Sequence, residues 1–170
     1  MAASGKKWEK LGGGLRSRVM FRGATKVTLD DKGRMVLPTV YRDQMPADAQ
    51  GKLVITLGSG KCLVMYPHAE WEQVERKLLA LPSLHPQAER LKGLMLGHAM
   101  MLELDSHSRF LLTTELREVA GLQRHAMLVG QGNSIQLWDE ARWIERRDKW
   151  LAQGDANMTG LTAELESLRL

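Results

Sequence analysis

Polar and apolar residues alternate along two separate stretches of the chain, which is the pattern of half-buried β-strands. In the first stretch, Val27 and Leu29 fall on one face and Lys26 on the other. In the second, Leu102 and Leu104 share one face. Each stretch runs into a polar turn and a short apolar strand, DDKG-RMVLP in the first case and DSHS-RFLLT in the second. The pattern predicts the same strand, turn and strand at two places.

An internal repeat relates these two places. When residues 21–42 are laid over residues 96–117, at an offset of 75, identical residues coincide in order. They are Ala24 with Ala99, Leu29 with Leu104, Asp30 with Asp105, Arg34 with Arg109, Leu37 with Leu112, Thr39 with Thr114 and Arg42 with Arg117. Farther along, an offset of 72 aligns Gly58 with Gly130, Gly60 with Gly132 and Trp71 with Trp143. This ordered series indicates two copies of one structural unit.

Helices are predicted after the strands of each copy. Thr39 and Thr114 can N-cap a brief helix through their hydroxyls. A second hairpin follows, LVITL-GSGK-CLVMY in the first copy and AMLV-GQGN-SIQLW in the second. An amphipathic helix then closes each copy, opened by Pro67 in the first and N-capped by Asp139 in the second. Ser83 is expected to open a helix that links the copies. The apolar stripe of the first closing helix is Trp71, Val74 and Leu78.

These elements define a mixed α+β fold built from two β-β-α-β-β-α units. Each unit is too small to bury a core well by itself, so the two are expected to share one. We divide the chain into a basic extension at 1–19, a first repeat at 20–81, a linking helix at 82–95, a second repeat at 96–152 and a tail at 153–170. The extension is interpreted as a disordered arm or as the result of a misassigned start site.

Charge is distributed unevenly along the chain. The net charge of +4 lies entirely in residues 1–19, which carry five basic residues and one glutamate. In the neutral remainder, residues 20–45 have a net charge of +2 and residues 96–120 a net charge of −2. A surface that faces phosphate groups is therefore expected on the first repeat. The second repeat is expected to complete the fold or to contact another subunit.

Enzyme and metal motifs are not found in the sequence. The GSGK run at residues 58–61 lacks the first glycine of a phosphate loop, since Ile55 stands there, and we interpret it as a hairpin turn. The five histidines show no metal spacing, and the single cysteine, Cys62, cannot form an internal disulfide. No stretch approaches the ~18 apolar residues of a membrane span. We therefore predict no catalytic residue, cofactor, metal or small-molecule substrate, no membrane contact, and a cytoplasmic location.

The recurring motif that offers chemistry is Asp-x-x-x-Arg, from Asp30 to Arg34 and from Asp105 to Arg109. In one interpretation, each pair brackets a tight turn and sets the strand register, with an exposed ion pair worth ~0–1 kcal/mol. In the other, Arg34, with Lys32 beside it, reaches into a DNA groove, where a guanidinium binds guanine O6 and N7 or a phosphate. The motif alone favours neither interpretation.

The run MFRGATKVTLDDKGRMVLPTVYR, from Met20 to Arg42, resembles the start of the MraZ family, bacterial transcriptional regulators of the division and cell-wall gene cluster. GHAMMLELDSHSRFLLTTELRE is similar to the second half of that family, as are the LVG-GN-LWDE and YP-EW stretches. The resemblance implies two tandem AbrB-like swapped β-hairpin units sharing one small β-barrel core, with flanking amphipathic helices. It also implies a ring-shaped, octamer-like homo-oligomer that binds double-stranded promoter DNA at the nucleoid.

In the MraZ family, the DxKGR motif of the first repeat carries the DNA contact, which the resemblance transfers to Asp30, Lys32 and Arg34. Arg109 is the counterpart in the second repeat. Two features depart from the family pattern: residues 1–19 precede its usual start, and DSHSR lacks the turn glycine, so that either Ser108 is strained or the turn differs. The candidate DNA-binding residues are Arg34, Lys32, Asp30, Arg22, Lys26 and Arg109.

The leading hypothesis is a sequence-specific DNA-binding regulator, a repressor of its own promoter and of the division and cell-wall cluster. An oligomer engages repeated promoter elements through equivalent turns of neighbouring subunits. The alternative is an antitoxin-like protein-interaction module with secondary DNA binding. The tail after Lys149 is only about twenty residues long, which is short for an antitoxin segment that wraps a toxin.

Overall fold

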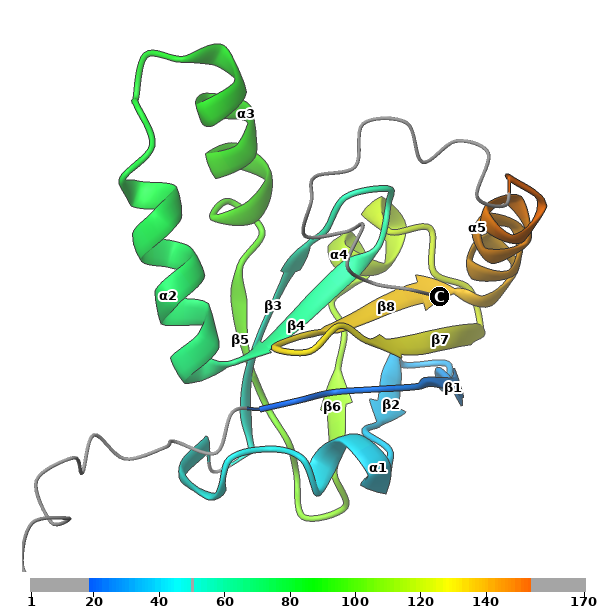
Figure 1. Ribbon diagram of the computed structural model, residues 1–170. Coiled ribbons are helices and arrows are strands. Elements are labelled where there is room, and N and C mark those ends of the chain that lie inside the picture. Colours follow the sequence, from blue (N-terminus) through cyan, green and yellow to red (C-terminus); the bar gives the residue numbers. More distant parts are fainter. Residues whose placement is uncertain (1–18, 50, 154–170) are drawn as a thin grey trace, which may run out of the picture.

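The two halves of the chain fold into the same order of elements in the computed structural model, which describes residues 19–49 and 51–153 (Figure 1). The predicted basic extension, apart from Val19, and the tail from residue 154 lie outside the described residues. The first half contains β1 (Ala24–Thr28), β2 (Arg34–Val36), α1 (Thr39–Arg42), a 3-10 turn (Ala47–Ala49), β3 (Lys52–Leu57), β4 (Leu63–Pro67) and α2 (His68–Leu79). After α3 (Pro86–Met95), the second half contains β5 (Met100–Glu103), β6 (Arg109–Leu111), α4 (Thr114–Val119), β7 (His125–Gly130), β8 (Ile135–Asp139) and α5 (Glu140–Gln153).

Strands from the two halves interleave in the main sheet, whose order is β1-β7-β8-β4-β3-β5. β1 pairs with β7, and β5 pairs with β3, so the first strand of each repeat adds to the hairpin of the other (Figure 1). The two hairpins meet where β4 pairs with β8. The predicted β/α repeat is confirmed, and the repeats exchange strands as the resemblance implied.

The expected small β-barrel is not closed. Among the strand pairings of the described residues, β1 and β5 are the edges of the main sheet and do not pair with each other. The turns that follow β1 and β5 lead β2 and β6 out of this sheet, and these two strands form a separate antiparallel ribbon. A six-stranded sheet and a two-stranded ribbon therefore enclose the core.

One hydrophobic core serves both repeats, as their small size predicted. Its buried side chains come from all eight strands and from α1 and α4. Met35 of β2 and Phe110 of β6 pair inside it. Tyr41 of α1 is fully buried, and its hydroxyl lies 2.7 Å from Gly23 O and 2.9 Å from Leu128 O. The first repeat is thereby joined to β7 of the second.

Helix α2 packs through the apolar stripe that its sequence predicted. Trp71 and Leu78 of α2 are buried against Val54 of β3. Asp139 caps α5, because its Oδ1 accepts a hydrogen bond from Arg142 N at 3.3 Å. Figure 1 shows α2 and α3 side by side at one end of the main sheet and α5 at the other. None of the described helices is long and apolar enough to cross a membrane.

Each brief helix begins at the threonine that was predicted to cap it, so its N-cap lies one residue earlier than predicted. Thr113, rather than Thr114, caps α4, and its Oγ1 accepts a hydrogen bond from Leu116 N at 3.3 Å. The N-cap of α1 is Pro38, so that Thr39 is already the first helical residue. The N-cap position requires an extended backbone, which Pro38 and Thr113 have.

The linking helix is shorter than predicted. It begins at Pro86, and its cap is His85, whose Nδ1 accepts a hydrogen bond from Gln87 N at 3.2 Å. Proline suits the first helical position because that residue needs no amide partner. Ser83 therefore lies before the helix and does not open it.

Candidate nucleic-acid interface

The loop between β1 and β2 is a tight turn held by the carboxylate of Asp30. Oδ1 accepts hydrogen bonds from Lys32 N at 3.0 Å and from Arg34 N at 2.9 Å. Gly33 N donates to Asp30 O at 2.9 Å, and Gly33 has a φ of +82°. Aspartate suits such a turn because its short side chain reaches the backbone amides two and four residues later. The Asp-x-x-x-Arg motif therefore brackets a turn, as one of its two interpretations predicted.

The same carboxylate fixes the guanidinium of Arg34. Nε donates to Asp30 Oδ2 at 2.8 Å, and both side chains are 42% exposed. The backbone hydrogen bond from Arg34, followed by the bond from its side chain, holds the pKa of Asp30 below its usual value. Within residues 19–49 and 51–153, no acceptor takes a hydrogen bond from the Nη groups of Arg34. Asp30 thus orients the guanidinium, and no described residue accepts a hydrogen bond from its two Nη groups.

The loop between β5 and β6 repeats this geometry. Asp105 Oδ1 accepts hydrogen bonds from His107 N at 2.8 Å and Arg109 N at 2.9 Å, and Oδ2 accepts one from Arg109 Nε at 2.8 Å. These bonds, chiefly the one from the backbone of Arg109, lower the pKa of Asp105 to about 2. Ser108 occupies the place of the turn glycine with a φ of +58°. The turn is therefore retained, and the departure in DSHSR is accommodated by a left-handed serine.

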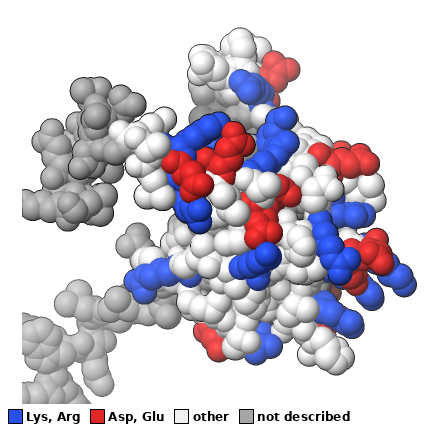
Figure 2. Space-filling view, turned by 90° about the vertical axis from the view of Figure 1, so that its right-hand side faces the viewer, with Lys and Arg blue, Asp and Glu red and all other residues white. Residues whose placement is uncertain are grey.

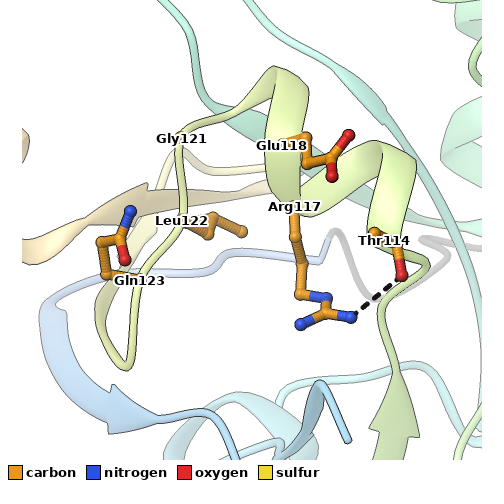
Figure 3. Close-up of a pocket in the computed structure, with 6 residues that line it drawn as sticks. All are labelled: Thr114, Arg117, Glu118, Gly121, Leu122 and Gln123. Carbon is orange, nitrogen blue, oxygen red and sulfur yellow. Dashed lines mark hydrogen bonds between the residues drawn. The ribbon is translucent and has the colours of Figure 1, made fainter. Parts of the chain in front are cut away.

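Each turn is also contacted by an arginine of the other repeat. Arg42 Nη1 donates to Ser108 Oγ at 2.9 Å. Arg117 lies over Gly33, where a Cβ atom would come within 2.7 Å of its Nε. Arg117 Nη2 also donates to Thr114 Oγ1 at 3.1 Å, beside an open pocket of about 380 Å³ (Figure 3). Ser108 therefore accepts a hydrogen bond from the arginine above its turn, and Gly33 leaves room for the arginine above its own.

The ribbon brings the two motif arginines onto one surface. Arg34 pairs with Leu111, and Val36 pairs with Arg109. These four side chains share the outer face, because side chains alternate along a strand and the central pair faces the core. Val36 is 51% exposed and Leu111 is 54% exposed. Neither was a candidate residue, although the alternation in RMV and RFL carries the signal.

Comparison with known proteins identifies the family to which this fold and motif belong. Residues 20–93 and 95–160 match a family described as "MraZ protein, putative antitoxin-like". The chain belongs to the MraZ family. The transcriptional regulator MraZ of Halorhodospira halophila is 47% identical over 152 residues, which are 89% of this chain and 100% of that protein. The protein of the same name from Pseudomonas putida is 51% identical over 125 residues, 73% of this chain and 83% of the relative.

Membership of the MraZ family confirms the prediction of a transcriptional regulator that is not an enzyme. The GSGK run and Cys62, which were predicted to be non-catalytic, belong to structural elements of the fold. GSGK forms the turn between β3 and β4, where Gly58 N donates to Cys62 O at 2.9 Å. Burial raises the pKa of the Cys62 thiol to about 11. In the part of the chain that the structure describes, no group of three His, Cys, Asp or Glu side chains could hold a metal ion.

The remaining candidate residues, Arg22 and Lys26, lie away from the turns of the β2–β6 ribbon. Lys26 Nζ on β1 is 2.9 Å from Glu140 Oε1 of α5. Arg22 is exposed just before β1 begins. Figure 2 shows the side of the molecule on which α5 lies, where basic and acidic side chains are mixed. The structure thus groups Asp30, Lys32 and Arg34 in one turn and adds Arg109 through the ribbon. Arg22 and Lys26 are separate from this group.

Proposed function

We propose that the protein is a sequence-specific DNA-binding repressor of its own promoter and of the division and cell-wall gene cluster. It acts in the cytoplasm, at the nucleoid, and binds repeated promoter elements as a ring-shaped, octamer-like homo-oligomer. Relatives named transcriptional regulator MraZ support a regulatory role. The observation that carries the proposal is the pair of equivalent Asp–Arg turns, which present two oriented arginines on one ribbon.

Arg34 is the residue that we propose to read a base. Because Asp30 holds Nε, the guanidinium is oriented before DNA arrives, and its two Nη groups can bind guanine O6 and N7 together. Asp30 acts as a positioning residue, since a carboxylate by itself repels phosphate. Lys32, which is exposed in the same turn, supplies a phosphate contact, and Arg109 repeats the role of Arg34. Arg22 and Lys26 are candidate phosphate contacts outside the turn.

Oligomerisation supplies the affinity that a single ribbon lacks. One ribbon offers only a few basic contacts with DNA. Linking several binding units in one particle raises the overall affinity by ~10²–10⁴ when the spacing of the DNA elements matches that of the units. Phosphate contacts also release counterions, so binding should weaken steeply as salt rises.

A protein-interaction module, similar to an antitoxin, is the second candidate. It is favoured by an open groove of about 880 Å³ between α3 and the β3–β4 turn, which includes the exposed side chains of Leu91 and Leu94. If binding of a small protein were the main function, DNA upstream of the gene would bind no more tightly than unrelated DNA of the same length.

A mobility-shift experiment tests the proposal. The probe is the DNA immediately upstream of the gene, with unrelated DNA as competitor, and light scattering gives the mass of the free protein. We expect a shift that survives competition and a particle of several subunits. The absence of a shift at low salt would contradict the regulator, and a monomer that binds with full affinity would contradict the ring.

A further inference from the structure

We propose that the outer face of the β2–β6 ribbon enters the major groove, and that Val36 and Leu111 contact the methyl groups of thymine there. This inference rests on the proposed DNA binding and deepens it, because it assigns the residues that distinguish one base pair from another beside the arginines. Neither residue belongs to the Asp-x-x-x-Arg motif.

The exposure of the two side chains is the first observation. The central pair of the ribbon is buried, with Met35 at 2% and Phe110 at 3%, whereas Val36 and Leu111 are each more than half exposed. The repeat relates the exposed positions, since Leu111 lies 75 residues after Val36, as Arg109 does after Arg34. Packing of the core therefore does not account for apolar side chains at these two places.

The dimensions of the ribbon favour DNA as the occupant. Its two strands lie about 4.8 Å apart, as in any β-ladder, and a two-stranded ribbon fits the major groove, which is about 12 Å wide. On the outer face, Arg34 stands opposite Leu111, and Val36 stands opposite Arg109. Each apolar side chain thus has an oriented guanidinium directly across the ladder.

The chemistry of the face matches the edges of the bases. Arginine binds the O6 and N7 acceptors of guanine, while an apolar side chain contacts the methyl group that only thymine carries in that groove. The face therefore fits a site in which guanine and thymine lie close together. A protein partner fits less well, because four side chains are far fewer than the roughly 20–30 residues per side of a stable protein interface.

Removing the thymine methyl groups from the DNA tests this inference. The full chain is titrated with its upstream DNA and with the same duplex in which every dT is replaced by dU, so that phosphates and base pairing are kept. We expect the wild-type protein to bind the dU duplex about fourfold more weakly for each methyl group contacted, the fold-change that burial of one such group provides. The variants Val36→Ser and Leu111→Ser should each lose part of this preference. The control is Leu84→Ser, because Leu84 is 98% exposed and lies away from the ribbon.

The outcomes separate this inference from the proposed function. Equal affinity of the wild-type protein for the two duplexes would overturn the inference while leaving DNA binding intact. The inference would also be overturned if both serine variants preferred the dT duplex over the dU duplex as strongly as wild type does. The same holds if the substitutions changed the particle mass but left this preference unchanged. No binding to either duplex at low salt would overturn the proposed function as well. Circular dichroism establishes that each variant is folded. The two variants test β2 and β6 of the ribbon independently.

Discussion

The two turns differ most clearly at the residue that must adopt a left-handed backbone. Gly33 fills this position in the first turn and Ser108 in the second, with φ values of +82° and +58°. A residue with a Cβ is strained in this region by of order 1–3 kcal/mol. The arginine above each turn accounts for the difference. Arg117 lies where a Cβ atom at position 33 would be, and Arg42 donates a hydrogen bond to the hydroxyl of Ser108.

Substitutions at these two positions should therefore have unequal effects. Gly33→Ala should lower the free energy of unfolding by about 1–3 kcal/mol, because the new Cβ is strained and displaces Arg117. Ser108→Gly should be nearly neutral, since relief of strain offsets loss of the hydrogen bond from Arg42. Urea denaturation of both variants measures the difference. Equal stability of Gly33→Ala and wild type would show that this turn does not require a glycine at position 33.

The titration of Asp105 tests the hydrogen bonds of the second turn. Its pKa is lowered to about 2, first by the backbone hydrogen bond from Arg109. A carboxylate with a lowered pKa in the folded state stabilises the fold above its unfolded pKa of about 3.9, and this contribution is lost as the pH falls through the folded value. We expect the side-chain carboxyl carbon to titrate near pH 2 by NMR. A midpoint near the unfolded value would show that these hydrogen bonds are absent in solution.

At the scale of elements, the turn and the ribbon form one unit that orients an arginine. Asp30 closes the turn with one carboxylate oxygen and holds the guanidinium with the other. The strands then place Arg34 and Arg109 on the same face. We therefore expect a change in Asp30 to alter DNA binding through the direction of Arg34 rather than through its own charge.

Asp30→Asn tests this expectation because asparagine can still accept the backbone hydrogen bonds but cannot form the ion pair. Affinity for the upstream DNA should fall by roughly fivefold, the equivalent of about 1 kcal/mol. Asp31→Asn is the matched control, since it removes the same charge from an exposed neighbour in the same turn. Binding isotherms for the two variants at one salt concentration give the comparison. An increase in affinity for both would show that Asp30 acts only by repelling phosphate.

For the whole molecule, strand exchange makes the two repeats mutually dependent. β1 and β5 complete the hairpins of the opposite repeats, and the core draws on every strand. Either repeat alone would expose a hairpin edge and half of the core, which a domain of this size cannot compensate.

Separated repeats should therefore fail to fold independently. We expect residues 20–95 and residues 96–153, expressed separately, to show no cooperative thermal transition by circular dichroism. Mixing them should restore a transition that depends on concentration, because the fold would then form between two chains. Cooperative unfolding of either fragment alone would contradict the shared core.

The repeat and the turn could be predicted from the sequence, because both depend on local patterns. The identities from Ala24 to Arg42 and the alternation around Val27 predict the order of elements, and Asp30 predicts the turn. Alternation does not reveal which strand lies next to β1. The family resemblance implied swapped hairpins, but only the structure identifies β7 as the strand that pairs with β1. The contact between Arg117 and Gly33 joins residues far apart in the sequence, and no local pattern reveals it.

Comparing how wild type and Arg34→Ala bind the upstream DNA shows whether Arg34 recognises the DNA sequence. Fluorescence anisotropy at one ionic strength compares the natural duplex with a shuffled duplex of the same composition. Arg147→Ala is the control, because Arg147 also forms an exposed ion pair with an aspartate, on α5. We expect Arg34→Ala to lose at least roughly fivefold in affinity, the lower end for a bidentate contact with a base, and to lose the preference for the natural sequence. If Arg34→Ala bound with the same affinity as wild type and kept the preference for the natural duplex, neither Arg34 nor the ribbon that presents it would recognise the DNA sequence.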